Sequence, residues 1–206
     1  MSYYFTILSP TDVPLFNIAF GTSKSGGDGI ARFRFPDAAQ NTYMTQFIIN
    51  SSLDMLEEAQ WMNGNMYLKH IDTYPPASAY ISAFLTPSGT RFVLLHQPPQ
   101  PNLPASSTAP GAAGSMSMSL SASTTSSSSG GGLFSGSGIG SSGRASSSSI
   151  AANPTAPQTE EAVRQFMSEV YEGYVKTVMS PFYRRGMEIR SPVFRARVSG
   201  AGRKWL

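Results

Sequence analysis

The sequence predicts an α/β domain of the α+β type, in which helices cover one five-stranded antiparallel sheet in the order ββαβββαα. Strand-like runs gather in the first half of the chain, two before and three after a stretch with helical periodicity. A second helical pattern follows near the C-terminus. Between these parts lies a long stretch of small residues, which indicates one domain interrupted by an insert.

The insert stands out by composition. Residues 98–157 consist almost wholly of Ser, Gly, Ala, Pro and Thr, and Arg144 is their one charged residue. Ordering a backbone costs roughly 1–2 kcal/mol per residue, and side chains this small bury too little apolar area to offset that cost. We therefore expect 98–157 to be disordered. The flanking blocks, 1–97 and 158–206, should fold as one domain because the second is too short for its own core.

Five short runs have the aromatic and β-branched composition of strands. The first two are Tyr3–Leu8 and Pro14–Phe20, and the Ser-Pro-Thr-Asp turn between them predicts a hairpin. The other three predict an antiparallel meander, because Pro87-Ser88-Gly89 supplies a tight turn before the last of them. These three runs are Met66–Tyr74, Ala79–Thr86 and Thr90–His96.

Residues 38–62 change to helical spacing, with a narrow polar strip that runs from Gln46 to Glu57. The rest of the helix is largely apolar, over an arc much wider than the roughly 100° that covers one core. We therefore expect this helix to pack on its own sheet and also on a second surface. The apolar residues are Met44, Phe47, Ile48, Ile49, Leu53, Met55, Leu56 and Ala59.

Three carboxylates, Asp54, Glu57 and Glu58, lie toward the C-terminal end of this helix. The helix dipole disfavours negative charge there by about 0.3–1 kcal/mol each, and no Lys or Arg lies one turn away along the helix. Two interpretations stay open. Either water alone solvates the cluster, or a basic surface of another protein meets it, with Trp61 and Met62 as apolar neighbours.

After the insert, a helix is predicted to begin at the N-cap Thr159 and to end before Pro181. Its apolar residues recur at three and four positions and give one buried face. Ser191 and Pro192 then have the N-cap and first-turn signature of a short final helix. The residues of the buried face are Val163, Phe166, Val170, Tyr174 and Val178.

The net charge of +3 has its origin in the C-terminal part, where only Glu188 opposes the basic residues that follow Pro181. A basic tail of this kind is more often a solvated surface than a contact site. The alternative is a contact with anionic lipid or an acidic partner, worth about 1 kcal/mol per charge. The residues of that contact would be Arg195, Arg197, Arg203 and Lys204, beside Trp205 and Leu206.

Signatures of catalysis are missing. The chain has no cysteine, and its two histidines, His70 and His96, fall in predicted strands, where a structural or solvent-facing role is expected. The Gly-rich stretch at 25–29 lacks the Gly-Lys-Ser/Thr of a P-loop. No apolar run is long enough for a membrane helix, and no secretory signal begins the chain. We expect a soluble, unsecreted, non-catalytic binding domain with no cofactor, metal, nucleic acid or small-molecule substrate.

Several separate segments resemble one family in the same order along the chain. Before the insert they are Thr45–Ile48, Ser52–Glu58, Asn65–Lys69, Ser82–Phe84 and Arg91–His96. After it they are Phe166, Val170–Tyr171, Tyr174–Lys176, Pro181–Tyr183, Ile189–Ser191 and Phe194. In these residues the chain resembles the sedlin family, the small second subunit of the TRAPP (transport protein particle) vesicle-tethering complex.

The resemblance implies a longin-like (profilin-like) fold, with one helix on one face of the sheet and two on the other. It also implies a non-catalytic adaptor in traffic from endoplasmic reticulum to Golgi and within the Golgi. Partners would be other TRAPP subunits and, indirectly, a Rab GTPase and vesicle or Golgi membranes. The expected location is cytoplasmic and peripheral at both organelles. Phe182 and Tyr183 join the candidate interface residues through this resemblance.

The chain departs from the family in its long Gly-rich loop at 21–37 and in the insert, where the family has a short connection. The insert leaves in doubt any partner that docks at that edge. An alternative function is the longin-type regulatory domain of another membrane-traffic complex, such as a SNARE or a coat-adaptor small subunit. A SNARE would need a C-terminal heptad region and an anchor, and neither is present in the sequence.

Overall fold

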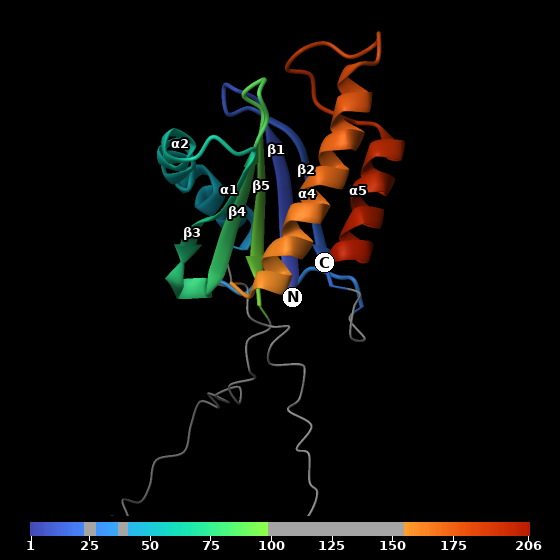
Figure 1. Cartoon of the computed structure of the whole chain (residues 1–206). Helices are drawn as coiled ribbons and strands as arrows, with labels where there is room; N and C mark the ends of the chain where they lie inside the picture. Colours follow the sequence, from blue (N-terminus) through green and yellow to red (C-terminus); the bar gives the residue numbers. More distant parts are fainter. Residues whose placement is uncertain (23–27, 37–40, 99–154) are drawn as a thin grey trace, which may run out of the picture. The chain divides into compact units, whose positions relative to one another are not determined.

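The computed structural model describes residues 1–22, 28–36, 41–98 and 155–206. In these ranges one open antiparallel sheet has the strand order β2-β1-β5-β4-β3, as the sequence predicts for its class. Helices α1 and α2 lie on one face of the sheet, and α4 and α5 lie on the other (Figure 1). Most of the expected disordered insert, 99–154, lies outside the described residues.

The five predicted strands are confirmed, each within one residue of its expected bounds. The turn between the last two strands contains Gly89 with a φ of 79°, the left-handed conformation that was expected of it. The strands are β1 Ser2–Leu8, β2 Pro14–Gly21, β3 Tyr67–Tyr74, β4 Ala79–Leu85 and β5 Arg91–Gln97.

Both faces of the three inner strands are buried, because successive side chains of a strand point to opposite sides. On β5, Phe92 and Leu94 pack in the core under α4 and α5. Val93 and Leu95 pack in the second core under α1 and α2. This explains why β1, β4 and β5 are nearly continuous apolar runs, whereas the edge strand β3 carries polar residues along its length.

The helical prediction is confirmed for the described residues from Asn41 to Met62, but the helix is interrupted at one residue, which gives α1 Asn41–Ser51 and α2 Leu53–Met62. Ser52 separates them and is fully buried. Its hydroxyl donates to the Ile49 carbonyl at 2.8 Å. A serine that bonds a carbonyl in the preceding turn bends a helix. Residues 38–40 lie outside the described residues.

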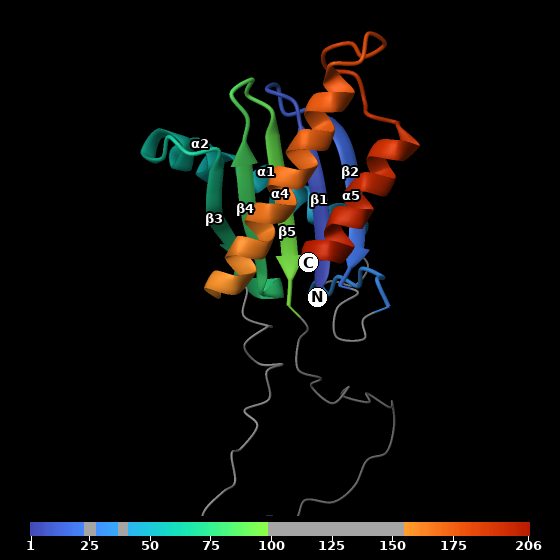
Figure 2. The same ribbon diagram turned by 45° about the vertical axis from the view of Figure 1, so that its right-hand side comes forward.

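Helix α4, Pro157–Val178, begins two residues before the expected N-cap Thr159. The reason is Pro157, whose fixed φ suits the first helical position. A backbone N–H at that position has no partner within the helix, so proline loses nothing by lacking one. The predicted apolar face is confirmed for Val163, Phe166 and Val170, which are buried on the sheet. Figure 2 shows α4 and α5 side by side across this face.

Helix α5, Pro192–Trp205, corrects the prediction of a short final helix followed by a tail. Its N-cap is Ser191 as expected, and the Ser191 hydroxyl accepts from the Phe194 backbone N–H at 3.3 Å. The helix continues because its inner face packs on the domain. At Gly202 a Cβ atom would lie 2.8 Å from the Phe20 ring, so the glycine permits close contact between α5 and β2. Among the helices of the described residues, none combines the length and apolarity needed to cross a bilayer.

Candidate protein interface

Helix α2 exposes large apolar side chains. Trp61 is 90% exposed and Met62 is 81% exposed, although both belong to a regular helix. At 100° per residue, these two share an arc of about 120° with Asp54, Met55 and Glu58, all of them exposed. We call these five residues the α2 surface. Only Leu53 and Leu56 of this helix are buried, on its opposite side.

The sequence predicts a wide apolar arc on the helix over 38–62, which corresponds to α1 and α2. Some side chains of that arc are buried in the core, and others are exposed to solvent. Ile48, Ile49, Leu53 and Leu56 pack in the core cluster with the sheet. Phe47 on α1 and Met55 on α2 are exposed. Large apolar side chains that gather on a surface, with polar groups around them, are typical of protein contact sites.

The three carboxylates of α2 have different surroundings. Asp54 lies in the first turn of α2, so the prediction that the helix dipole disfavours its charge is wrong. Arg91, at the start of β5, makes ion pairs with Glu57 at 2.9 Å and with Asp12 in the turn between β1 and β2. The sheet therefore supplies Glu57 with a basic partner that the helix lacks. Within the described part of the chain, Asp54 and Glu58 make no ion pair, and they point outward beside Trp61.

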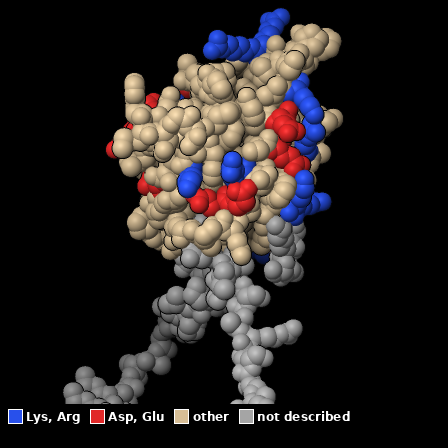
Figure 3. Space-filling view, viewed as in Figure 1, with Lys and Arg blue, Asp and Glu red and all other residues tan. Residues whose placement is uncertain are grey.

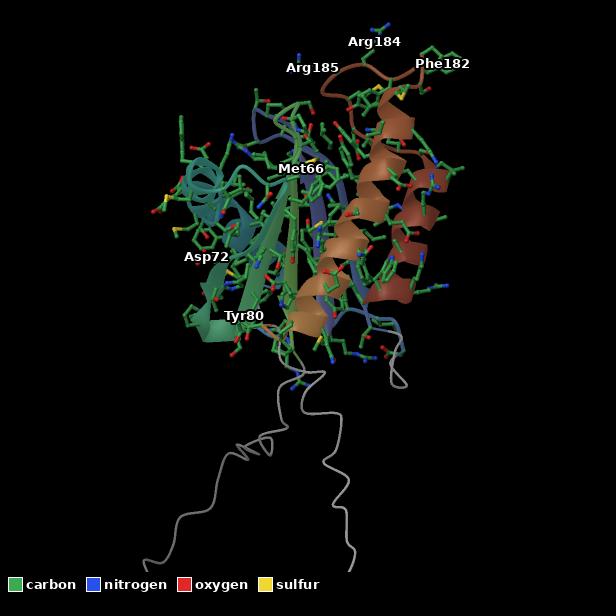
Figure 4. All side chains as sticks on the ribbon, viewed as in Figure 1. Met66, Asp72, Tyr80, Phe182, Arg184 and Arg185 are labelled. Carbon is green, nitrogen blue, oxygen red and sulfur yellow. The ribbon has the colours of Figure 1, made fainter. Side chains whose placement is uncertain are left out.

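Phe182 and Tyr183 lie in the loop 179–191 between α4 and α5, which we call the α4–α5 loop. Figure 1 shows it above the end of the sheet, on the opposite side from α2. Phe182 is 87% exposed, and Figure 4 shows it at the outer end of the loop. Tyr183 instead packs against the core under α4, where burial raises its pKa. The structure thus divides the expected interface residues between two separate surfaces.

The basic residues near the C-terminus belong to α5. The Lys204 ammonium lies 3.1 Å from the Glu169 carboxylate on α4. The Trp205 indole N–H donates to the same carboxylate at 2.7 Å, and these two hydrogen bonds lower the pKa of Glu169. Leu206 is buried. Trp205 and Leu206 are therefore held against the domain and do not extend into solvent.

The remaining α5 cations, Arg195, Arg197 and Arg203, are exposed. The Arg195 guanidinium lies 5.3 Å from the centre of the Phe16 ring, so part of its side chain covers β2. Figure 3 shows basic side chains at the top of the molecule, over the α4–α5 loop, and along the right-hand edge, over α5. The positive charge expected at the C-terminus is thus spread over one side of the domain.

The two histidines lie in a row of rings across β1, β5, β4 and β3. His96 is 1% exposed, stacks on Tyr80 with ring centres 5.6 Å apart, and has no hydrogen-bond partner among the described residues. Burial, together with a smaller effect of nearby His70, lowers the pKa of His96 to about 4. His70 is exposed and shares a 2.8 Å hydrogen bond with the Thr73 hydroxyl. His96 therefore lies in the core as a neutral ring.

Comparison with known proteins identifies relatives over the whole chain. The family model described as Sedlin matches residues 7–204. The Transport protein particle 20 kDa subunit of Schizosaccharomyces pombe is 26% identical, with all of both chains covered. The Probable trafficking protein particle complex subunit 2 of Drosophila melanogaster is 24% identical over all of this chain and 97% of its own. The Trafficking protein particle complex subunit 20 of Saccharomyces cerevisiae is 25% identical, over 100% and 99% of the two chains.

Proposed function

The chain belongs to the sedlin family, and on that premise we propose that it is a non-catalytic subunit of a trafficking protein particle complex. The relatives that match it over their full or nearly full length carry names of such subunits. The family match over 7–204 favours this function over a SNARE or coat-adaptor regulatory domain. The α2 surface is the single structural feature that carries the proposal.

The chemistry of the α2 surface fits a protein partner. Trp61 and Met62 offer apolar area, and aromatic residues and methionine are enriched at protein interfaces. Asp54 and Glu58 surround that area with negative charge that no described residue neutralises. A partner subunit that presents basic and apolar side chains would bury Trp61 and pair with the carboxylates of Asp54 and Glu58.

A non-catalytic role agrees with the placement of the two histidines. His96 is buried among aromatic rings, and His70 is hydrogen-bonded to Thr73. Neither lies in a hydrogen bond with a Ser hydroxyl or a carboxylate within the described residues, as a catalytic base normally does. In this proposal the subunit works in the cytoplasm, peripherally at Golgi and endoplasmic reticulum, and meets a Rab GTPase through the complex.

The proposal predicts that Asp54→Lys and Trp61→Ala each weaken assembly at least about tenfold, since truncated interface tryptophans and reversed interface charges commonly cost 2 kcal/mol or more. The measurement is the amount of this chain that co-purifies with the other subunits of the complex after co-expression. Far-ultraviolet circular dichroism should be unchanged, because neither side chain is buried.

The matched control is Glu172→Lys, which reverses one exposed carboxylate on α4, on the other side of the sheet. It should co-purify at the wild-type level. Equal losses for Asp54→Lys and Glu172→Lys would point to a non-specific charge effect. Wild-type assembly by both α2 variants would refute α2 as the docking surface.

A further inference from the structure

We infer that the α4–α5 loop is a contact site for an anionic membrane surface. This inference does not depend on the proposed function, because the loop and the α2 surface lie on opposite sides of the sheet (Figure 1). It rests on three observations: the loop has a defined conformation, it ends in exposed apolar side chains, and it carries arginines that no described residue neutralises.

The loop is held at both ends. The Tyr183 backbone N–H donates to the Ser180 carbonyl at 3.0 Å, and the Tyr183 ring packs on the core. At the other end, the Ile189 N–H donates to the Leu15 carbonyl on β2 at 2.8 Å, and Ile189 is buried. The segment between these anchors therefore keeps its shape without a partner, and binding requires little additional ordering.

A tight turn forms the outer end of the loop. The Met187 N–H donates to the Arg184 carbonyl at 3.0 Å, and Gly186 has a φ of 82°, which a side chain would disfavour. This turn carries Arg184 and Arg185, and Figure 4 shows both on the same loop as Phe182, with Arg184 between the other two. Neither arginine makes an ion pair within the described residues, whereas Arg190 is paired with Glu188 at 2.8 Å.

The apolar side chains of this region are strongly exposed: Met179 77%, Phe182 87%, Met187 45% and Val193 76%. Phe182, Arg184, Arg185 and Met187 form what we call the loop tip, whereas Met179 directly follows α4 and Val193 lies on α5. An aromatic ring beside unpaired arginines, on a segment that projects from the domain, matches a membrane interface. The ring enters the boundary between headgroups and acyl chains, and the guanidinium groups bind lipid phosphates.

The shape of the loop tip favours a membrane over an acidic protein. A stable protein contact buries about 800 Å² on each side, which requires a broad complementary face. The α4–α5 loop is instead a narrow projection, and the groove behind it, of about 590 Å³, is lined by residues of the loop itself together with Thr177. A bilayer accepts a projecting tip because lipids adapt their packing to it.

The test is flotation of the full chain with vesicles of phosphatidylcholine, either alone or with a third of phosphatidylserine. We expect binding to the anionic vesicles that falls as salt is raised. Arg184→Glu combined with Arg185→Glu should lower that binding at least about tenfold, because each charge near such a surface contributes about a factor of five. Phe182→Ser should lower it several-fold on both vesicle types.

The matched control is Arg195→Glu with Arg203→Glu, which removes the same number of charges from α5. It should leave most of the binding in place. The inference fails if the wild-type chain binds no anionic vesicle, which would leave an acidic protein as the partner of the tip. It also fails if the α5 pair abolishes binding while the loop pair does not, because α5 would then be the contact.

Discussion

Replacement of Phe166 by alanine is expected to lower the free energy of unfolding by about 3–5 kcal/mol, a large part of the 5–15 kcal/mol typical of a domain. Phe166 lies on α4, is fully buried, and meets Phe5 of β1 edge-on with ring centres 5.3 Å apart. The substitution removes a ring that joins the block after the insert to the block before it. Urea unfolding followed by circular dichroism measures the loss.

Phe166→Leu is the control, because it keeps most of the apolar volume and should cost less than about 1.5 kcal/mol. The same experiment tests whether the two blocks form one domain. One cooperative transition, shifted as a whole by Phe166→Ala, is the expected result. Two separate transitions, of which only one responds, would show that residues 155–206 fold apart from the sheet.

Acidification from pH 7 to pH 4 is expected to destabilise the wild-type domain by roughly 3 kcal/mol more than the His96→Phe variant. Burial holds the pKa of His96 at about 4, whereas an unfolded histidine titrates near its ordinary 6.5. Below pH 6.5 the unfolded chain binds a proton that the folded chain excludes. The stability from neutral His96 is thus present above pH 6.5 and is lost as the pH falls toward 4.

The measurement is the free energy of unfolding at several pH values for both chains. His96→Phe keeps a ring against Tyr80 and Tyr3, the two rings that contact His96, but removes the proton-binding group. His70→Asn serves as the second variant. Because His70 is exposed, its loss should leave most of the pH dependence of the free energy of unfolding unchanged. Identical pH profiles for wild type and His96→Phe would show that His96 is hydrated and not neutral in the core.

The sequence predicts the strands well because the signal is local. Each inner strand is buried on both faces, so its apolar run is continuous and ends at a turn residue such as Gly89. The start of α5 is local in the same way, since Ser191 caps it with its own hydroxyl. Such elements require no knowledge of distant contacts.

The features that the sequence does not predict depend on tertiary packing. Ser52 interrupts the first helix because its buried hydroxyl donates to the Ile49 carbonyl, and on a helical wheel it is only one more small residue. The length of α5 depends on the fit of Gly202 against Phe20, although glycine disfavours helices. Arg91 bonds to Glu57 although the two are 34 residues apart in the sequence, so the spacing of residues within a helix cannot predict this pair.

The candidate interface is predictable in part. The wide apolar arc indicates that α2 contacts something besides its sheet, and the exposure of Trp61 and Met62 agrees with that expectation. The sequence does not indicate that Phe182 belongs to a different surface, because its distance from α2 depends on the course of α4 over the far face. It also gives no sign that Trp205 is fixed to Glu169.

The most direct test of the central claim is photo-crosslinking from α2 inside the assembled complex. A photoreactive phenylalanine analogue in place of Trp61 should crosslink to one neighbouring subunit, and the same probe in place of Glu172 on α4 should not crosslink to that subunit. If the probe at Trp61 reacts only with solvent in the intact complex, the α2 surface is exposed there and does not join this chain to its neighbours.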